Sequence, residues 1–214
     1  MNALAMYDHQ TRTLWSQFLG QGVQGPQKGV KLDFVPATHT QWSLWRDAHP
    51  DTLVLDKRGR YQVDVYRGYY SGGSAGVIGE ALQDSRLDRK DLVVGVEAGG
   101  HTKAYPFDLL EGQPAVNDSL GSEEILVFLE RDTDTALVYQ RAVDGQTLTF
   151  RLEGQGTGHK ATLVDDQTGT RWSALTGAAI EGPLKGQILT RALSHLSFWF
   201  AWKDWNPDTE LYSG

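Results

Sequence analysis

No cysteine occurs anywhere in this chain of 214 residues. Its absence excludes disulfides, thiolate catalysis and cysteine metal sites, but a cysteine-free chain is tolerated in either redox environment, so the compartment stays open. Basic residues are outnumbered, the net charge is −7, and no long basic run marks a nucleic-acid partner. No apolar run approaches the length of about 20 residues that a membrane span needs. The start, MNALAMYDHQ, lacks the basic and apolar regions of a signal peptide.

The residues that are present favour a folded chain. Hydrophobic residues make up 40% of the sequence, and seven of them are tryptophans, so the chain can bury a substantial core and general disorder is excluded. The length suits one large domain or two small ones.

One stretch of the chain occurs twice. Asp8–Gly29 reads DHQTRTLWSQFLGQGVQGPQKG, and Asp165–Gly186 reads DDQTGTRWSALTGAAIEGPLKG, at a constant offset of 157 residues. The match continues without a gap, and 18 of 49 positions are identical between Tyr7–Leu55 (copy one) and Val164–Tyr212 (copy two). Neither copy is low in complexity, so the pattern predicts an internal duplication.

Short strands separated by turns dominate the rest of the pattern. Because most connections are turns rather than helical crossovers, we expect a mainly β, α+β fold, arranged as an antiparallel sandwich or a partly closed barrel. Asp144-Gly145 predicts a type I′ turn that joins Thr135–Arg141 and Thr147–Leu152 in a hairpin. The expected strands are Ala5–Asp8, Thr13–Phe18, Lys31–Val35, Leu92–Val96, Thr102–Tyr105, Ile125–Leu129, Thr135–Arg141, Thr147–Leu152, Ala161–Asp165, Thr170–Leu175 and Gln187–Arg191.

Each copy is expected to end in a short helix that carries tryptophans. Thr40 and Ser197 stand at equivalent positions and suit helix N-caps. The pairs Trp42/Trp45 and Trp199/Trp202 are spaced i, i+3, which places both rings of a pair on one helical face. We interpret these tryptophans as core residues rather than as a ligand-stacking platform. A proline follows each helix and limits it to about nine residues.

Gly72–Gly76 fits the pattern G-x-S-x-G, which in some hydrolases exposes a nucleophilic serine between a strand and a helix. Here the nucleophile would be Ser74, with Tyr66–Tyr70 as the strand and Val77–Gln83 as the helix. Its acid and base would have to be chosen arbitrarily among Asp132, Asp165, His159 and His195. Small residues around one serine are also ordinary linker composition, which is the interpretation we favour.

Other polar groups give weaker indications. The acidic loop Glu130–Asp134 matches no calcium-loop register and reads as a solvated loop. The six histidines show no zinc spacing, and Gly154–Ala161 lacks the ending of a phosphate-binding loop, so no metal or cofactor is predicted. Acid, threonine and tryptophan recur in the two copies, and either folding or function explains their joint retention. These residues are Asp8, Gln10, Thr11, Trp15 and Ser16, with Asp165, Gln167, Thr168, Trp172 and Ser173.

Read together, the motifs resemble the DUF3179 family, a bacterial and archaeal domain of unknown function. The residues that carry the resemblance run in order through 92–212, as VVGVEAGG, KAYPFDLL, VND, YQR and DGQTLTF followed by copy two. Copy one resembles only the latter half of the pattern, in MYDHQTRTLWSQ and WSLWRDAHPDTLVL. The resemblance implies that 1–70 is the C-terminal half of a first unit, 71–91 a Gly/Ser-rich and charged linker, and 92–214 a near-complete second unit.

The sequence departs from the family pattern at one important place. The family's C-P-x-C pair, which implies redox chemistry or metal binding, falls here on Glu130 and Thr133, where no thiolate can form. The resemblance therefore implies a redox-silent structural or binding module. The alternative is an enzyme, using either Ser74 or an acid–base site around Glu130 and Asp165 with Asn117, Asp118 and Trp172 nearby.

The incomplete first unit carries a physical expectation. The resemblance implies that the chain is the C-terminal part of a longer two-unit protein, whose export the family pattern allows. Residues 1–55 would then lack the strands of their own front half, so we expect an unpaired sheet edge or an exposed apolar face. Such a face would borrow strands from the second unit or from another chain, which predicts self-association. The sequence identifies no ligand.

Overall fold

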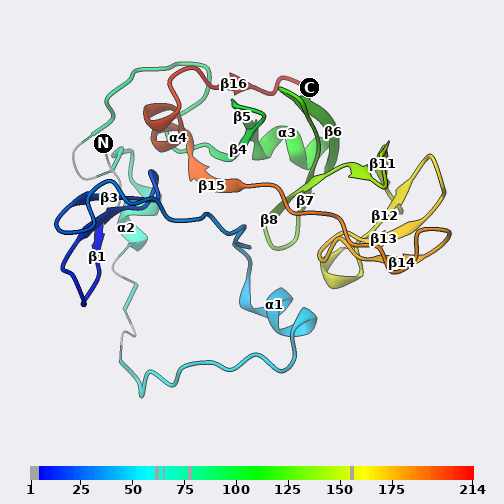
Figure 1. The fold of residues 1–214 in the computed structure, drawn as a ribbon, viewed down its shortest axis with the longest axis horizontal. Coiled ribbons are helices and arrows are strands. Elements are labelled where there is room, and N and C mark those ends of the chain that lie inside the picture. The colour runs from blue at the N-terminus through cyan, green and yellow to red at the C-terminus, as the bar shows by residue number, and fades with distance from the viewer. Residues whose placement is uncertain (1–4, 61–62, 65, 77–78, 155–156) are drawn as a thin grey trace.

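A computed structural model describes residues 5–60, 63–64, 66–76, 79–154 and 157–214. Antiparallel strands dominate, and the described strands close no barrel (Figure 1). The strand β16 pairs with β5 in the parallel direction. The α+β class expected from the sequence is confirmed, and among the described residues no helix is long and apolar enough to cross a membrane. In the part of the chain that the structure describes, the α-helices are α1 (Trp42–Ala48), α2 (Arg67–Ser71), α3 (Phe107–Gly112) and α4 (Trp199–Trp205), and Gly158–Lys160 form a 3-10 turn, η1.

The strands form several small sheets. Copy one contributes the sheet β1-β2-β3, formed by Ala5–Tyr7, Leu14–Ser16 and Gln21–Gln24. The sheet β15-β4-β5-β16 is formed by Ser194–Phe198, Leu92–Ala98, His101–Pro106 and Glu210–Leu211. The sheet β6-β7-β8 is formed by Ala115–Leu120, Glu123–Glu130 and Thr135–Gln140. The sheet β11-β12-β13-β14 is formed by Phe150–Leu152, Thr162–Asp165, Arg171–Ser173 and Ala179–Glu181. The expected turn at Asp144-Gly145 is present, in the short hairpin β9-β10 of Ala142–Val143 and Gln146–Thr147. The expected pairing of Thr135–Arg141 with Thr147–Leu152 is wrong, because β8 pairs with β7 and β11 pairs with β12.

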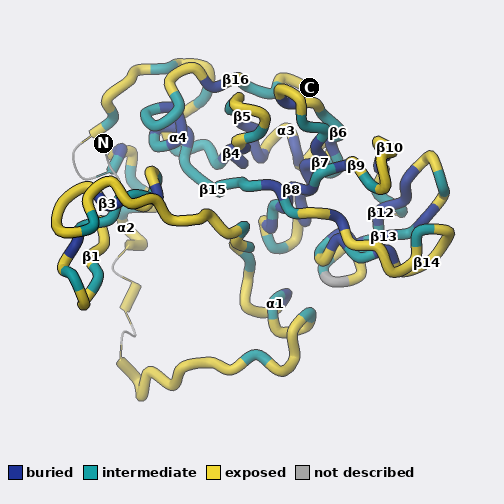
Figure 2. The backbone as a smooth tube through the Cα atoms, viewed as in Figure 1, coloured by how far each residue is buried: buried dark blue, intermediate teal, exposed yellow. Residues whose placement is uncertain are grey.

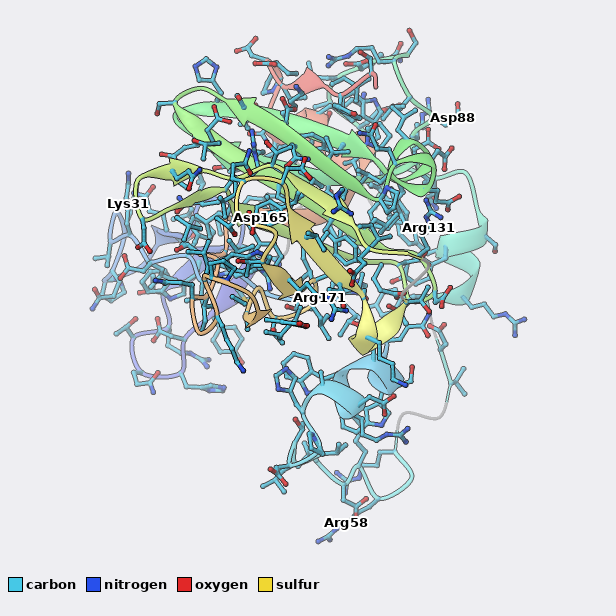
Figure 3. All side chains as sticks on the ribbon, turned by 90° about the vertical axis from the view of Figure 1, so that its right-hand side faces the viewer. Lys31, Arg58, Asp88, Arg131, Asp165 and Arg171 are labelled. Atoms are coloured by element: carbon cyan, nitrogen blue, oxygen red, sulfur yellow. The ribbon has the colours of Figure 1, made fainter. Side chains whose placement is uncertain are left out.

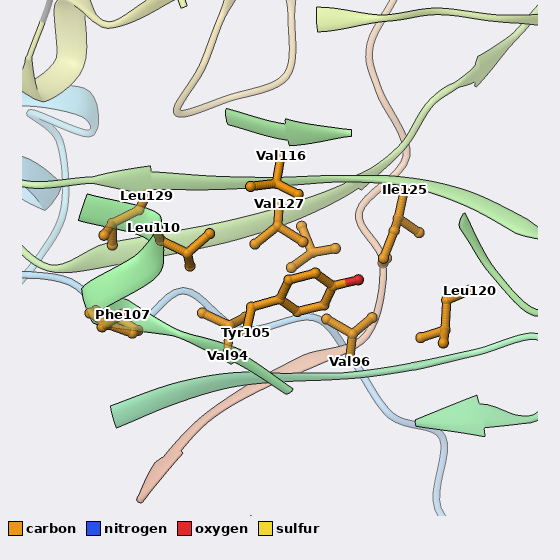
Figure 4. Packing of buried hydrophobic residues seen from close by; sticks show 12 residues of the cluster. Val94, Val96, Tyr105, Phe107, Leu110, Val116, Leu120, Ile125, Val127 and Leu129 are labelled. Atoms are coloured by element: carbon orange, nitrogen blue, oxygen red, sulfur yellow. The ribbon is translucent and has the colours of Figure 1, made fainter. Parts of the chain in front are cut away.

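The strand β7 lies at the centre of the fold because it is buried on both faces. Successive side chains of a strand point to opposite faces. Ile125, Val127 and Leu129 therefore pack toward β4 and β5 (Figure 4), while Leu126 and Phe128 pack toward β11–β14. This two-sided burial explains why β7 reads as a continuous apolar run rather than an alternating one. The sheets are thus stacked in layers, which is the sandwich-like arrangement expected.

The helix α4 covers the outer face of the β4–β5 sheet. Trp199 and Trp202 are fully buried and pack against Val93 and Ala104. A Cβ atom added to Gly95 would lie 2.3 Å from the Trp202 ring, so only glycine lets the helix approach this closely. The expected core role is confirmed for Trp199 and Trp202. It is wrong for Trp42, which is 48% exposed, because no described sheet covers it as β4 and β5 cover Trp199. The expected N-caps are wrong, because the cap positions are Gln41 and Phe198 and no side chain caps either helix.

Copy one is far more exposed than copy two. Trp42 is 48% exposed, whereas its equivalent Trp199 is 0% exposed. The chain that follows α1 runs away from the body of the molecule, with Arg58 at its far end (Figures 2 and 3). Large apolar side chains are exposed along much of residues 6–55, namely Met6, Tyr7, Leu19, Val23, Val30, Leu32, Phe34, Val35, Trp42, Leu53, Val54 and Leu55. The exposed side chains agree with the expectation that residues 1–55 leave apolar surface uncovered.

The segment before β4 packs along α4 rather than running free. Asp204 accepts hydrogen bonds from the backbone N–H groups of Ala81 and Leu82, at 2.7 and 2.8 Å. Phe200 donates its N–H to the carbonyl of Arg89 at 3.0 Å. The charged half of the expected linker is therefore held along α4.

The two expected runs Lys31–Val35 and Gln187–Arg191 are not strands. Each contributes only isolated bridges, such as Gln21 to Lys31 and Ala178 to Ile188. Before each run the chain closes a loop within its own copy, where Gly29 and Gly186 donate their N–H groups to the carbonyls of Gly22 and Ala179. Gln187–Arg191 also reaches β8, through a bridge between Tyr139 and Arg191.

Candidate functional site

Glu130, which stands where the resemblance places the first cysteine, ends the central strand β7 inside a tight turn. Its carboxylate accepts the Thr133 N–H at 2.9 Å, the Thr133 hydroxyl, and the N–H of Gly158 at 2.9 Å. The residue is 2% exposed. A buried carboxylate needs such donors to offset its desolvation, and here the backbone and a threonine supply them.

The same turn closes the first hairpin of each copy. Asp165 accepts the Thr168 N–H at 2.6 Å, the Thr168 hydroxyl at 2.9 Å, and the Trp172 indole N–H at 2.9 Å. Asp8 accepts the corresponding groups of Thr11 and Trp15. The hydroxyl and N–H of Thr11, followed by the Trp15 indole, hold the pKa of Asp8 far below its usual range.

The three turns share the spacing acid-x-x-Thr-x-Thr. In each, the two threonine hydroxyls lie 2.7 Å apart, and the residue between them has a positive φ, with Arg12 at 61°, Asp134 at 50° and Gly169 at 70°. ERDTDT in the acidic loop therefore repeats the geometry of DHQTRT and DDQTGT. The sequence holds this signal, and our reading of Glu130–Asp134 as a solvated loop missed it.

Asn117, Asp165 and Trp172 meet around one residue, Phe150. Asn117 donates to the Phe150 carbonyl and accepts its N–H, both at 2.7 Å. Phe150 stands opposite Asp165 across β11 and β12. The ring centroids of Phe150 and Trp172 lie 5.8 Å apart in a T-shaped arrangement. Asp165 and Trp172 are 0% exposed, so the residues are brought together in packing rather than around an open cleft. Figure 3 shows Asp165 amid surrounding side chains.

Asp118 belongs to a separate polar cluster, formed with Lys103 and Tyr105. It accepts hydrogen bonds from the Tyr105 hydroxyl and the Lys103 ammonium, each at 2.8 Å. Burial opposes ionisation of Asp118, but these two donors outweigh it and lower its pKa. Burial and the neighbouring carboxylate raise the pKa of Tyr105. The cluster ties β5 to β6, and Tyr105, which sequence reasoning did not single out, is its buried member.

A scan against family models matched residues 1–209 to DUF3179, a protein of unknown function. This chain belongs to the DUF3179 family. The matched range covers copy one, copy two as far as Thr209, and nearly the whole chain. A search of curated proteins and a search of solved structures each returned no match. Family membership therefore supports the resemblance without supplying an activity.

In this DUF3179 chain, Ser74 follows a helix rather than the strand that a hydrolase nucleophile needs before it. The expected strand Tyr66–Tyr70 is wrong, because this stretch forms the helix α2. Ser74 is exposed, and the expected helix after it includes residues 77–78, outside the described residues, as is the side chain of His159. The α2 end and the β12 strand that carries Asp165 lie on opposite sides of the molecule (Figure 1), while Asp165 itself is committed to its turn.

The hollow beside Glu130 is small. It has a volume of about 30 Å³ and is lined by Pro114, Phe128, Leu152 and Thr157, among others. That volume suits a water molecule, whereas small-molecule sites commonly measure about 300 Å³ or more. A larger cavity of about 310 Å³ lies around His101 and Asp208, but none of the candidate residues lines it. Among the described residues, no three His, Asp or Glu side chains are grouped for metal binding.

Proposed function

We propose that this DUF3179 protein is a redox-silent binding module. The observation that carries the proposal is the use of Glu130, whose carboxylate accepts hydrogen bonds from Thr133 and Gly158 in a buried turn. The C-P-x-C chemistry implied by the family resemblance has no thiol at Glu130 or Thr133. A group that must accept structural hydrogen bonds is poorly placed to exchange protons with a substrate.

The other candidate residues support the same proposal. Asp165 anchors a threonine and a buried indole, Asn117 joins two sheets through the backbone of Phe150, and Asp118 joins β6 to β5. Each side chain has a contact that explains its presence as a stabilising element. Constraint on folding is therefore sufficient to account for the acid, threonine and tryptophan retained in the two copies.

The domain division belongs to this proposal. We assign 92–214 to the second unit because its two large core clusters draw all of their residues from Leu92–Tyr212. Residues 1–70 form the C-terminal half of a first unit, and 71–91 connect the two, with their charged half held along α4. A unit with a complete core beside one with an open face suits a module that binds a partner through the open half.

Replacing Glu130 with glutamine tests whether this residue is structural. The variant should lose about 2–3 kcal/mol of unfolding free energy, because one carboxylate oxygen becomes an amide that faces buried donors. Urea denaturation followed by circular dichroism measures the loss. The matched control is Asp132→Asn in the same turn, whose exposed side chain should leave stability within about 0.5 kcal/mol.

An active-site carboxylate behaves in the opposite way, since its removal commonly leaves stability unchanged or raises it. Equal or greater stability of Glu130→Gln would therefore contradict the proposal. Covalent labelling of Ser74 by a fluorophosphonate probe would contradict it from the other side, by showing an activated serine.

A further inference from the structure

The helix α1 and the residues after it present a surface that no described part of the chain covers fully. We define the α1 surface as Trp42, Trp45, Arg46, Asp47 and Thr52–Leu55. Trp42 is 48% exposed, and Leu53 and Leu55 are 95% and 82% exposed. The opposite side of α1 is seated on the second unit, where Leu44 is buried beside η1. Exposed apolar side chains gathered in this way mark an interaction site.

Copy two shows what covers the equivalent surface. There Trp199 and Trp202 lie against Val93 and Ala104 of the β4–β5 hairpin. The residues that follow, Glu210–Leu211, add a parallel strand to β5, opposite Lys103 and Ala104. The corresponding residues of copy one, Leu53 and Val54, add to no sheet among the described strands.

The charged residues of the α1 surface match those of α4. In copy two, Lys203 pairs with Glu80 at 2.9 Å, and Asp204 accepts the N–H groups of Ala81 and Leu82. Arg46 and Asp47 stand at the equivalent positions. Their side chains are 61% and 45% exposed and contact one another at 3.5 Å. The surface therefore offers a cation for a carboxylate and a carboxylate for two backbone N–H groups.

The α1 surface repeats one side-chain hydrogen bond of its covered counterpart. Trp45 donates its indole N–H to the Thr52 hydroxyl at 2.9 Å, as Trp202 does to Thr209 at 2.9 Å. This bond sets the path of the chain from the helix into the strand-forming residues. A surface that is ordered before binding loses less conformational entropy when a partner binds.

A second copy of this chain does not offer the missing cover. Its β4 is paired on one side by β15 and its β5 by β16, and α4 fills the face between them. A free hairpin of this kind would require α4 and β16 to detach, with loss of two buried tryptophans. The occupant must therefore bring its own strands.

We infer that the α1 surface docks a partner polypeptide with the chemistry of Glu80–Pro106. The partner would place a carboxylate on Arg46, two backbone N–H groups on Asp47, and a glycine-containing β-hairpin under Trp45. Thr52–Leu55 would then extend the hairpin as a parallel strand, a common mode of peptide recognition. This inference rests on the proposed binding role and specifies its partner.

A synthetic peptide of residues 80–106 is the probe for this site. Titrated against the full chain by calorimetry, it should bind in the micromolar range, and hydrogen exchange should slow in 42–55 but not in 199–212. The same peptide with Gly95→Val should bind at least about 10-fold more weakly, because a side chain there meets the indole ring. Absence of saturable binding, or unchanged exchange in 42–55, would overturn the inference.

A charge exchange makes the test specific. Glu80→Arg in the peptide should weaken binding about 10-fold, and Arg46→Glu in the chain should restore it. Arg60→Glu, an exposed residue of the loop after α1, is the control and should restore nothing. Failure of restoration by Arg46→Glu would count against the assigned register.

Two further outcomes separate this inference from the proposal beneath it. Self-association of the chain without peptide, with protected 42–55, would identify a second copy as the occupant and overturn the inference. If the peptide does not bind but Glu130→Gln is destabilised, the inferred partner is rejected. The proposal that the protein is redox-silent then still stands.

Discussion

Substitution of Gly95 by valine is expected to destabilise the protein by about 3 kcal/mol, at the upper end of overpacking penalties. The first added atom would lie 2.3 Å from the Trp202 ring, and neither the buried indole nor the central strand β4 can move away freely. Helix α4 should separate from the sheet, which would also loosen β16. Urea denaturation with tryptophan fluorescence would report both the loss and the exposure of Trp202.

Two companion variants control for this effect. Gly68→Ala adds a Cβ atom that meets nothing within 4 Å in helix α2, so it should be neutral or slightly stabilising. Trp202→Leu combined with Gly95→Val should cost less than the sum of the single changes, because both act on one contact. Simple additivity, or an unaffected Gly95→Val variant, would mean that α4 does not pack on Gly95.

The second large effect is expected at the paired tryptophans Trp172 and Trp15. Trp172→Ala should cost about 3–5 kcal/mol, as buried tryptophan truncations do, because the side chain is 0% exposed and its indole N–H satisfies Asp165. Trp15→Ala removes the same hydrogen bond to Asp8 from a partly exposed site, so it should cost about 1 kcal/mol.

Both indoles donate the same hydrogen bond to an aspartate. The difference between the two variants therefore measures the contribution of burial to stability. Thermal denaturation of the two variants beside the unmodified chain gives the comparison directly. A Trp15→Ala loss equal to that of Trp172→Ala would show that copy one is as well packed as copy two, contrary to the exposure seen here.

Much of this fold was accessible from the sequence. The tryptophan spacing indicated α1 and α4, Asp144-Gly145 indicated a hairpin turn, and the apolar run Ile125–Leu129 indicated a buried strand. These signals are local or periodic, so they survive without knowledge of the neighbours. The offset repeat also directed attention to Asp165 and Trp172, although not to the bond between them.

Features set by tertiary contacts could not be predicted from the sequence. Tyr66–Tyr70 has a strand-like composition, yet it forms helix, which illustrates how context overrides propensity. The segment Glu80–Asp91 reads as a linker because its hydrogen bonds go to Asp204, far along the chain. The role of Glu130 is visible in the sequence only when ERDTDT is aligned with DHQTRT and DDQTGT. Its contact with Gly158 has no signal in the sequence.

The central claim is that the two copies share their local hydrogen bonds but only copy two is covered. Amide hydrogen exchange of the free chain tests it most directly, because exchange reports local opening along the sequence. We expect α1 and Thr52–Leu55 to exchange at least about 100-fold faster than α4 and β16, relative to intrinsic rates. Equal protection of the two regions would contradict it.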